Sequence, residues 1–176
     1  TGVQTCALPI WALVLRIDDT DPTRTVERGE ESILEDLAWL DVRCDEGPVR
    51  QSDRAGRHAE AALRALDAGA VRDADGSIRL RGTTLARPDG TATYQLATVV
   101  DDLDLAITHV IRGSDHRANE EVQRRIAAAL GGTLPTVVHH GLLLGADGRK
   151  LSKRAAHASI ADLRAEGIPA AAVRAY

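Results

Sequence analysis

The chain contains two lysines, Lys150 and Lys153, and both lie in the run K-L-S-K-R at 150–154. An ammonium is a compact, mobile charge, whereas the guanidinium of the many arginines is a planar fork. The run follows G-A-D-G at 145–148, a pattern typical of a tight turn. A glycine-flanked loop with two ammoniums and the hydroxyl of Ser152 suits contact with a polyphosphate. The alternative is a solvated basic loop, and spacing alone does not decide between them.

Three further groups of polar side chains are placed at the ends of predicted strands. They are Arg16 with Asp18, Asp19 and Asp21, then Tyr94 with Asp101 and Asp102, and finally Arg112 with Asp115 and His116. A zwitterionic amino acid and a nucleotide together need such a set, because an ammonium prefers a carboxylate, a carboxylate prefers an arginine fork, and phosphates prefer lysines and backbone N–H groups. Each group also has a structural alternative. Aspartates commonly cap helices, and Asp101 and Asp102 could pair with surface arginines.

The histidines and cysteines do not predict a metal centre. His139 and His140 are adjacent, and neighbouring residues of a strand point to opposite faces, so we expect that they do not share a metal. His58 is expected on the surface of a helix. Cys6 and Cys44 have neither metal-ligand spacing nor a disulfide framework. No zinc is expected.

Alternating strands and helices are expected to position these groups. Strands are predicted over 11–17, 107–111, 136–138 and 142–144, helices over 25–40, 52–66, 120–130 and 159–166, a turn over 45–48 and a hairpin over 73–90, while 94–105 is ambiguous. Ser52 and Ser159 are predicted N-caps, and Gly69 and Gly167 are predicted helix stops. This alternation predicts an α/β fold. In open α/β sheets, the carboxyl ends of strands are where ligands bind.

Composition limits the class of protein. The 176 residues allow one domain with a real core, which must be built from Leu, Val, Ile and Ala because the chain has no Phe and no Met. A net charge of −4 argues against nonspecific binding of nucleic acid over the whole surface, but it leaves room for a local basic face. No apolar run is long enough to span a bilayer, and no signal peptide is recognisable. A reducing, cytoplasmic location is expected.

Both ends of the chain are expected to be cut. There is no Met, and residues 170–176 read as a helix that stops without a cap. Residues 1–10 resemble the conceptual translation of a common short-read sequencing adapter. We therefore expect an artefactual leader that packs poorly, with a native strand and turn as the alternative.

Taken in order, the motifs resemble the catalytic core of a glutamyl-tRNA synthetase, a class I aminoacyl-tRNA synthetase. R-I-D-D-T-D at 16–21 is similar to the R-I-E-D-T-D segment of that family, and K-L-S-K-R is similar to its K-M-S-K-S loop. The other matching segments are W-L at 39–40, D-E-G-P at 45–48, R-Q-S-D-R at 50–54, Y-Q-L-A-T-V-V-D-D at 94–102 and I-T-H-V-I-R-G-S-D-H at 107–116. The resemblance implies a Rossmann-like α/β core.

The resemblance also implies roles for the residues of a glutamate pocket. Asp18 would contact the amino group of the substrate, where the family usually has Glu. Tyr94 and Arg112 would line the pocket, with Arg112 as a fork for a carboxylate. The side chain of Asp18 is one methylene shorter than that of Glu, which could move or weaken the contact with the amine.

For ATP, the resemblance implies a second set of residues. Asp115 would lie near the adenosine, and Lys150, Ser152 and Lys153 would contact the phosphates. Lys150 and Lys153 would be catalytic, because they would stabilise charge that develops on the leaving pyrophosphate. Mg²⁺ would accompany ATP, which is a substrate here.

Some features of the family are not found. The H-I-G-H-type segment, the first strand and an N-terminal arginine belong upstream of residue 11, the acceptor-binding insertion is short, and an anticodon-binding domain would follow residue 176. The expected divisions are a leader over 1–10, a first core part over 11–70, the shortened insertion over 71–92, a second core part with the lysine loop over 93–154, and the start of a helical region over 155–176.

These features lead to one main interpretation and two alternatives. The main one is a fragment of a glutamate–tRNA ligase, inactive by itself and monomeric when full length, with tRNA, glutamate and ATP as partners and no membrane. The nearest alternative is the glutamyl-Q tRNA(Asp) synthetase type of enzyme, which lacks the anticodon domain. The other alternative is a non-catalytic remnant that binds nucleotide or RNA.

Overall fold

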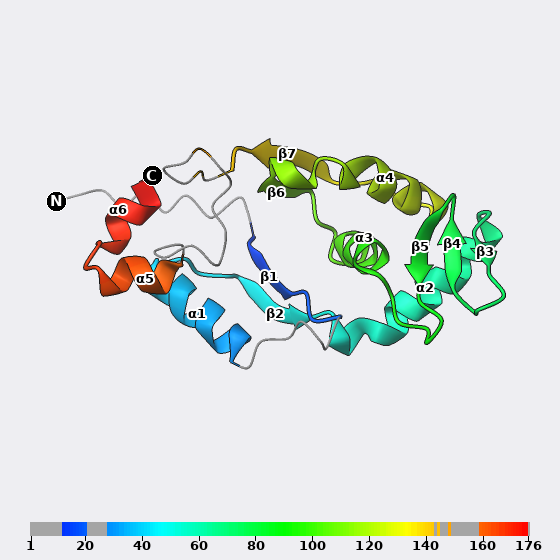
Figure 1. Cartoon of the computed structure of the whole chain (residues 1–176), viewed down its shortest axis with the longest axis horizontal. Coiled ribbons are helices and arrows are strands. Elements are labelled where there is room, and N and C mark those ends of the chain that lie inside the picture. The colour runs from blue at the N-terminus through cyan, green and yellow to red at the C-terminus, as the bar shows by residue number, and fades with distance from the viewer. Residues whose placement is uncertain (1–11, 21–27, 143, 145–147, 149–158, 176) are drawn as a thin grey trace.

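The computed structural model describes residues 12–20, 28–142, 144, 148 and 159–175. In chain order the elements are β1 (Val14–Ile17), α1 (Gly29–Trp39), β2 (Glu46–Arg50), the 3₁₀ turn η2 (Ser52–Arg54), α2 (Ala55–Asp67), β3 (Val71–Arg72), β4 (Ile78–Leu80), β5 (Thr83–Ala86), α3 (Tyr94–Asp104), β6 (His109–Gly113), the 3₁₀ turn η3 (Ser114–His116), α4 (Asn119–Ala129), β7 (Thr136–His140), α5 (Ile160–Ala165) and α6 (Ala170–Ala175). The predicted α/β fold is confirmed (Figure 1).

Within the described ranges the strands form three small sheets. β1 pairs in parallel with β2, and β6 pairs in parallel with β7 from His109 opposite Thr136 to Gly113 opposite His140. The third sheet is antiparallel, in the order β3-β4-β5. Parallel pairing at two places, each with a helix in the connection, agrees with an α/β architecture.

The hydrophobic core surrounds α3, which lies between α2 and α4 and packs against β5 (Figure 1). Leu85, Leu96 and Val99 are fully buried, and Ile126 of α4 is 1% exposed. Leucine, valine, isoleucine and alanine therefore supply the core, as the composition requires. None of the described helices is long and apolar enough to cross a membrane.

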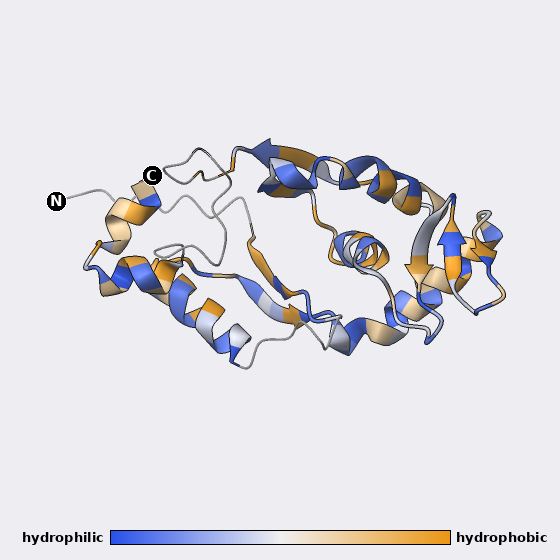
Figure 2. Ribbon diagram, in the orientation of Figure 1, coloured by the Kyte–Doolittle hydropathy of each residue, from blue (hydrophilic) through white to orange (hydrophobic). Residues whose placement is uncertain are grey.

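The other end of the molecule has a different character. None of the residues of α1, α5 and α6 is buried, and Ile33 of α1 is 44% exposed. Polar and apolar residues are mixed along α1 and α5 (Figure 2). Arginines connect them, because Arg164 lies 3.5 Å from Asp36 and Arg174 donates a 2.7 Å hydrogen bond to the Leu40 carbonyl.

Several predicted element ends are confirmed. Ser159 begins α5 with a capping box that includes Asp162. Gly69 and Gly167 follow helices with φ of 92° and 78°, which favours glycine at both positions. The helix predicted over 120–130 is α4. The strand predicted over 107–111 is β6, shifted by two residues.

Other local predictions are wrong. Ser52 does not cap a helix, because α2 begins at Ala55 without a side-chain cap. Residues 46–50 form a strand and not a turn, since their backbone pairs with β1. Glycine is needed at position 47, where φ is 104° and a Cβ would lie 2.3 Å from the Leu15 carbonyl oxygen. Leu142 lies in no strand, because β7 ends at His140.

The ambiguous stretch at 94–105 is helix α3. Tyr94 is its first residue, and Asp101 and Asp102 lie in its last turns. The group of Tyr94, Asp101 and Asp102 is therefore not placed at the end of a strand, contrary to prediction.

Candidate active site

A cavity of about 720 Å³ lies between β1, α3 and β6. One wall is formed by residues 12–16 of β1 and its approach, and the opposite wall by residues 107–112, which include most of β6. Asp18, Tyr94 and Arg112, the three residues that the family resemblance assigns to a glutamate pocket, all line it. The volume is in the range of pockets that hold small molecules.

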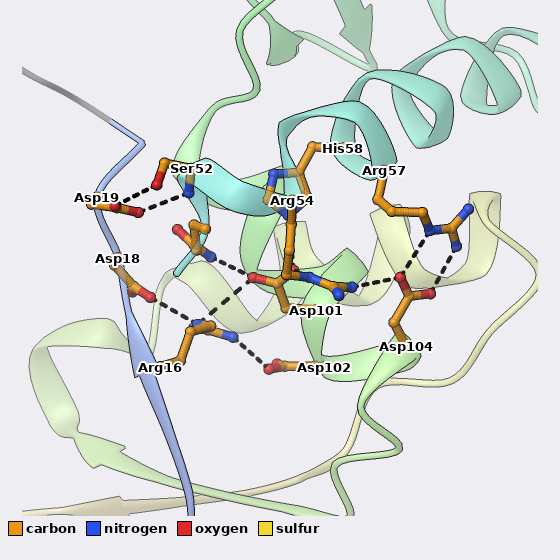
Figure 3. A network of polar contacts seen from close by, with 11 residues as sticks. Arg16, Asp18, Asp19, Ser52, Arg54, Arg57, His58, Asp101, Asp102 and Asp104 are labelled. Carbon is orange, nitrogen blue, oxygen red and sulfur yellow. Dashed lines mark hydrogen bonds and ion pairs between the residues drawn. The ribbon is translucent and has the colours of Figure 1, made fainter. Parts of the chain in front are cut away.

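Arg16 connects the wall at β1 to helix α3 (Figure 3). Its Nε donates to Asp18 Oδ1 at 2.7 Å and lies 3.8 Å from Asp101 Oδ2, while its Nη1 donates to Asp102 Oδ1 at 3.0 Å. The Arg16 side chain is 20% exposed, so these contacts are shielded from water more than surface ion pairs are. Burial alone would lower the pKa of Arg16, but its contacts with Asp18, Asp102 and Asp101 outweigh burial and raise it. The guanidinium therefore stays charged.

Asp101 is the most deeply buried carboxylate of the network. Its side chain is fully buried and accepts hydrogen bonds from Gln51 at 2.7 Å, Arg54 at 2.7 Å and His58 at 2.8 Å. Burial would raise its pKa, but the donors His58, Arg54 and Gln51 outweigh burial and hold the pKa below its ordinary value. Asp101 is thus an anion satisfied by donors from β2, η2 and α2.

Asp102, its neighbour on α3, has the opposite shift. Burial raises the pKa of Asp102 above its ordinary value, against the opposing effect of Arg16. Asp101, Asp102 and Asp104 all lie near the C-terminal end of α3, where the helix dipole disfavours anions. Arginines from β1, η2 and α2 offset this cost.

Two structural expectations for this region need correction. His58 is not on the surface, because its side chain is 1% exposed and it pairs with Asp101. Asp101 and Asp102 pair with arginines, as their structural alternative proposed, but Arg16 and Arg54 are mostly buried and not surface residues.

Asp19 connects β1 to η2. It accepts hydrogen bonds from the Ser52 N–H at 2.8 Å and the Ser52 hydroxyl at 2.6 Å. Burial would raise the pKa of Asp19, but these two hydrogen bonds outweigh burial and lower it. Asp19 therefore fixes the end of β1. Asp21, of the same group, lies outside the described residues.

On the opposite wall, Arg112 presents an unsatisfied donor. Its Nη1 donates to Gln123 at 2.7 Å and its Nε lies 3.5 Å from His139 Nε2, whereas its buried Nη2 has no hydrogen-bond partner among the described residues. Thr98 also lines the cavity, and its buried hydroxyl has no partner in the described part of the chain. Buried polar groups are costly unless they are paired. Arg112 and Thr98 are therefore two residues of the cavity lining that each keep an unused donor.

Tyr94 and His116 form one side of the cavity. Their ring centroids are 6.4 Å apart with an angle of 46° between the planes. Asn119 lies 3.1 Å from His116 Nδ1 and also accepts from Gln95 at 3.0 Å. The start of α4 therefore fixes His116 beside Tyr94.

Asp115 follows β6 in η3 but does not line the cavity. Its carboxylate folds back over Gly113, where an added Cβ would lie 2.5 Å from Asp115 Oδ1. Glycine at position 113 leaves room for this approach.

The remaining predicted site residues cannot be placed. Lys150, Ser152 and Lys153 lie outside the described residues. Among the residues that are described, no group of three or more His, Cys, Asp or Glu side chains could hold a metal ion. His139 lies 3.9 Å from Glu120, and His140 contacts the Gly141 carbonyl at 2.6 Å.

The sequence did not single out Thr98. A lone threonine in an apolar helix carries no signal, and only the fold shows that it borders the cavity. Arg16 was singled out, but its contacts with Asp101 and Asp102 span about 85 residues and are not visible in local spacing.

Comparison with known proteins identifies the family of this chain. Residues 12–74 and 72–176 match the family model for the catalytic domain of class I tRNA synthetases (E and Q). A glutamate–tRNA ligase 1 from Rubrobacter xylanophilus is 44% identical over 182 residues, which cover 88% of this chain and 42% of that protein. A glutamate–tRNA ligase 2 from Paracoccus denitrificans is 34% identical, over 93% of this chain and 48% of that protein. The chain spans less than half the length of these relatives.

Solved structures agree on the fold. A crystal structure of a glutamate tRNA ligase from Elizabethkingia meningosepticum in complex with its amino acid superposes with a TM-score of 0.70 at 23% identity, over 80% of this chain and 45% of that one. A putative arginyl-tRNA synthetase from Campylobacter jejuni superposes with a TM-score of 0.61 at 16% identity, over 82% and 36%. By the family match and the curated relatives, the chain belongs to the class I tRNA synthetases of the E and Q type and contains part of their catalytic domain.

Proposed function

We propose that the protein containing this chain ligates glutamate to tRNA, through a glutamyl-adenylate made from glutamate and ATP. Relatives that are 34% and 44% identical over most of this chain carry the name glutamate–tRNA ligase. The observation that carries the proposal is a pair of oppositely charged residues that line one cavity, Arg112 on one wall and Asp18 on the other.

The two walls suit the two charged ends of glutamate. Asp18 would accept hydrogen bonds from the substrate ammonium. Arg112 would donate to a substrate carboxylate, with Tyr94 and Thr98 in the lining of the same cavity. Charge-assisted hydrogen bonds of this kind are about twice as strong as neutral ones.

The chemical step would be attack of the glutamate α-carboxylate on the α-phosphorus of ATP. A new oxygen–phosphorus bond forms, the bond to the bridging oxygen breaks, and pyrophosphate leaves. Lys150 and Lys153 would stabilise the charge that develops on pyrophosphate, Ser152 would contact the phosphates, and Asp115 would lie near the adenosine. The glutamyl group would then pass to the 3′ end of tRNA.

Mg²⁺ is proposed as the ion that ATP carries with it. The described residues contain no cluster suited to a metal, so we assign no step to a metal bound by this part of the chain.

Glutamate-dependent exchange of pyrophosphate into ATP, measured on the full-length protein, tests the proposal. Exchange is expected with glutamate and not with aspartate, and Lys153→Ala is expected to lower it by about 10²-fold, as for loss of one key contact to the transition state. Wild-type exchange in Lys153→Ala would refute the role of Lys153. Absence of exchange in the wild-type protein would instead favour the non-catalytic remnant. Charging of tRNA(Glu) against tRNA(Asp) then separates the ligase from the glutamyl-Q type.

A further inference from the structure

Asp18 is an exposed aspartate that directly follows β1, and none of the residues of β1 is fully buried. Its side chain is 41% exposed, and all four residues of β1 are only partly buried. A carboxylate in such a place has several open rotamers, and ordering a side chain on binding costs affinity. Effective recognition of an ammonium therefore needs another residue to hold the Asp18 side chain in one orientation.

Arg16 is the described group that does so. Its Nε donates to one oxygen of Asp18 at 2.7 Å, and its Nη1 donates to Asp102 at 3.0 Å. The guanidinium is thus held from α3 while it holds Asp18 (Figure 3). A planar fork with donors on two sides suits this bridge, which a lysine could not reproduce in full.

Asp101 supports the same guanidinium from behind. Its Oδ2 lies 3.8 Å from Arg16 Nε, and donors from Gln51, Arg54 and His58 immobilise its carboxylate. Three of these groups, Gln51, His58 and Asp101, are buried to 1% exposure or less. A fully buried anion with this many partners is a rigid anchor, because rotating it would leave several donors unpaired.

We propose that Arg16 and Asp101 are positioning residues, which hold the Asp18 carboxylate in the orientation that receives the substrate ammonium. The inference rests on the proposed function, in which Asp18 binds that ammonium. Asp101 does not line the cavity, and Arg16, which does, directs its guanidinium to Asp18 and Asp102. Arg16 and Asp101 act through Asp18, so their effect is specific for the amino group and not for the carboxylates of the ligand.

The test compares two ligands of the full-length protein, glutamate and 2-hydroxyglutarate, which has a hydroxyl in place of the ammonium. Dissociation constants are measured for the wild type, Arg16→Gln, Arg16→Lys and Asp101→Asn. Arg57→Gln is the matched control, because Arg57 pairs with Asp104 on the exposed side of α3, away from the cavity. Thermal unfolding of each variant reports whether the fold is kept.

Arg16→Gln is expected to raise the dissociation constant of glutamate about 10-fold, which is the size of one charge-assisted contact. The dissociation constant of 2-hydroxyglutarate is expected to change by less than about twofold. Arg16→Lys and Asp101→Asn are expected to fall between Arg16→Gln and the wild type, and Arg57→Gln to match the wild type. Arg16→Lys keeps the positive charge, so it supplies the test if Arg16→Gln does not fold.

Equal losses for both ligands would show that Arg16 only maintains the fold, and unchanged glutamate binding would show that Asp18 needs no positioning. Either result overturns the inference alone. If the wild-type protein does not prefer glutamate to 2-hydroxyglutarate, the proposed role of Asp18 fails, and the inference fails with it.

Discussion

The half of the molecule around α3 and the half around β1 and α1 are held together by different forces. Around α3, Leu85, Leu96 and Ile126 are almost completely buried. Around α1 and α5, no residue of either helix is buried, and the described contacts between them include the ion pair of Arg164 with Asp36 and the cation–π contact of Arg164 with Trp39 at 5.8 Å. Apolar burial stabilises the first half, whereas exposed polar contacts of small value connect the second.

The candidate site lies where these halves meet. Arg112, Tyr94 and Thr98 come from elements at the well-packed half, while Asp18 comes from β1. The partly buried ion pairs of Arg16 with α3, and of Arg54 with Asp101, join the two sides. The difference teaches that polar contacts of Arg16 with α3 help to connect the two walls of the cavity.

The largest expected effect comes from a substitution that leaves a void in the hydrophobic core around α3. Leu96→Ala should lower the free energy of unfolding by about 2–5 kcal/mol, because Leu96 is fully buried. Ile33→Ala in α1, where the residue is 44% exposed, should change it by no more than about 0.5 kcal/mol. Urea unfolding measures both, and similar losses in the two variants would contradict the contrast between the halves.

Arg112→Ala tests the cavity wall that belongs to the well-packed half. Arg112→Ala should raise the KM for glutamate in pyrophosphate exchange by about 10- to 10²-fold, since a hydrogen bond to a charged group is lost. The fold should survive, because the backbone pairing of β6 with β7 and the packing of α4 against α3 do not depend on the Arg112 side chain. Arg117→Ala, in the turn before α4, is a control that should leave the KM unchanged. An unchanged KM in Arg112→Ala would exclude its role as the carboxylate fork.

The smallest expected effect is on the pH dependence of stability. It distinguishes Asp101 from Asp102, because their pKa values are shifted in opposite directions. The pKa of Asp101 in the folded state lies below the ordinary 3.8, so its contribution to stability is present above about pH 3.8 and is lost as the pH falls through the folded pKa. The pKa of Asp102 lies above 3.8, so Asp102 favours the folded state below that pH and loses this effect as the pH rises through the folded pKa.

Urea unfolding between pH 2 and 7 distinguishes the two carboxylates. Asp101→Asn should flatten the loss of stability in acid, while Asp102→Asn should make it steeper. The same slope in both variants would contradict the opposite pKa shifts.

Local sequence signals predicted much of the fold but little of the polar network. The capping box at Ser159 and the stop at Gly69 depend on neighbouring residues, so they are visible in the sequence. β2 was missed because E-G-P reads as a turn, and only pairing with β1 makes it a strand. His58 was misplaced because its partner Asp101 lies 43 residues away.

The candidate site was predictable as a set of residues and not as a geometry. Motif resemblance selected Asp18, Tyr94 and Arg112, and the fold brings all three to one cavity. The sequence contains no signal that Arg112 Nη2 lacks a partner among the described residues or that Asp101 is fully buried. Both depend on how elements distant in the sequence pack together.

A structure of the full-length protein with glutamate bound tests the central claim most directly. We predict that the ammonium nitrogen lies within about 3.2 Å of the Asp18 carboxylate, with Arg16 still bridging Asp18 to Asp102, and that Arg112 Nη2 donates to a substrate carboxylate. Glutamate bound outside this cavity, or inside it with its ammonium turned away from Asp18, would contradict the account.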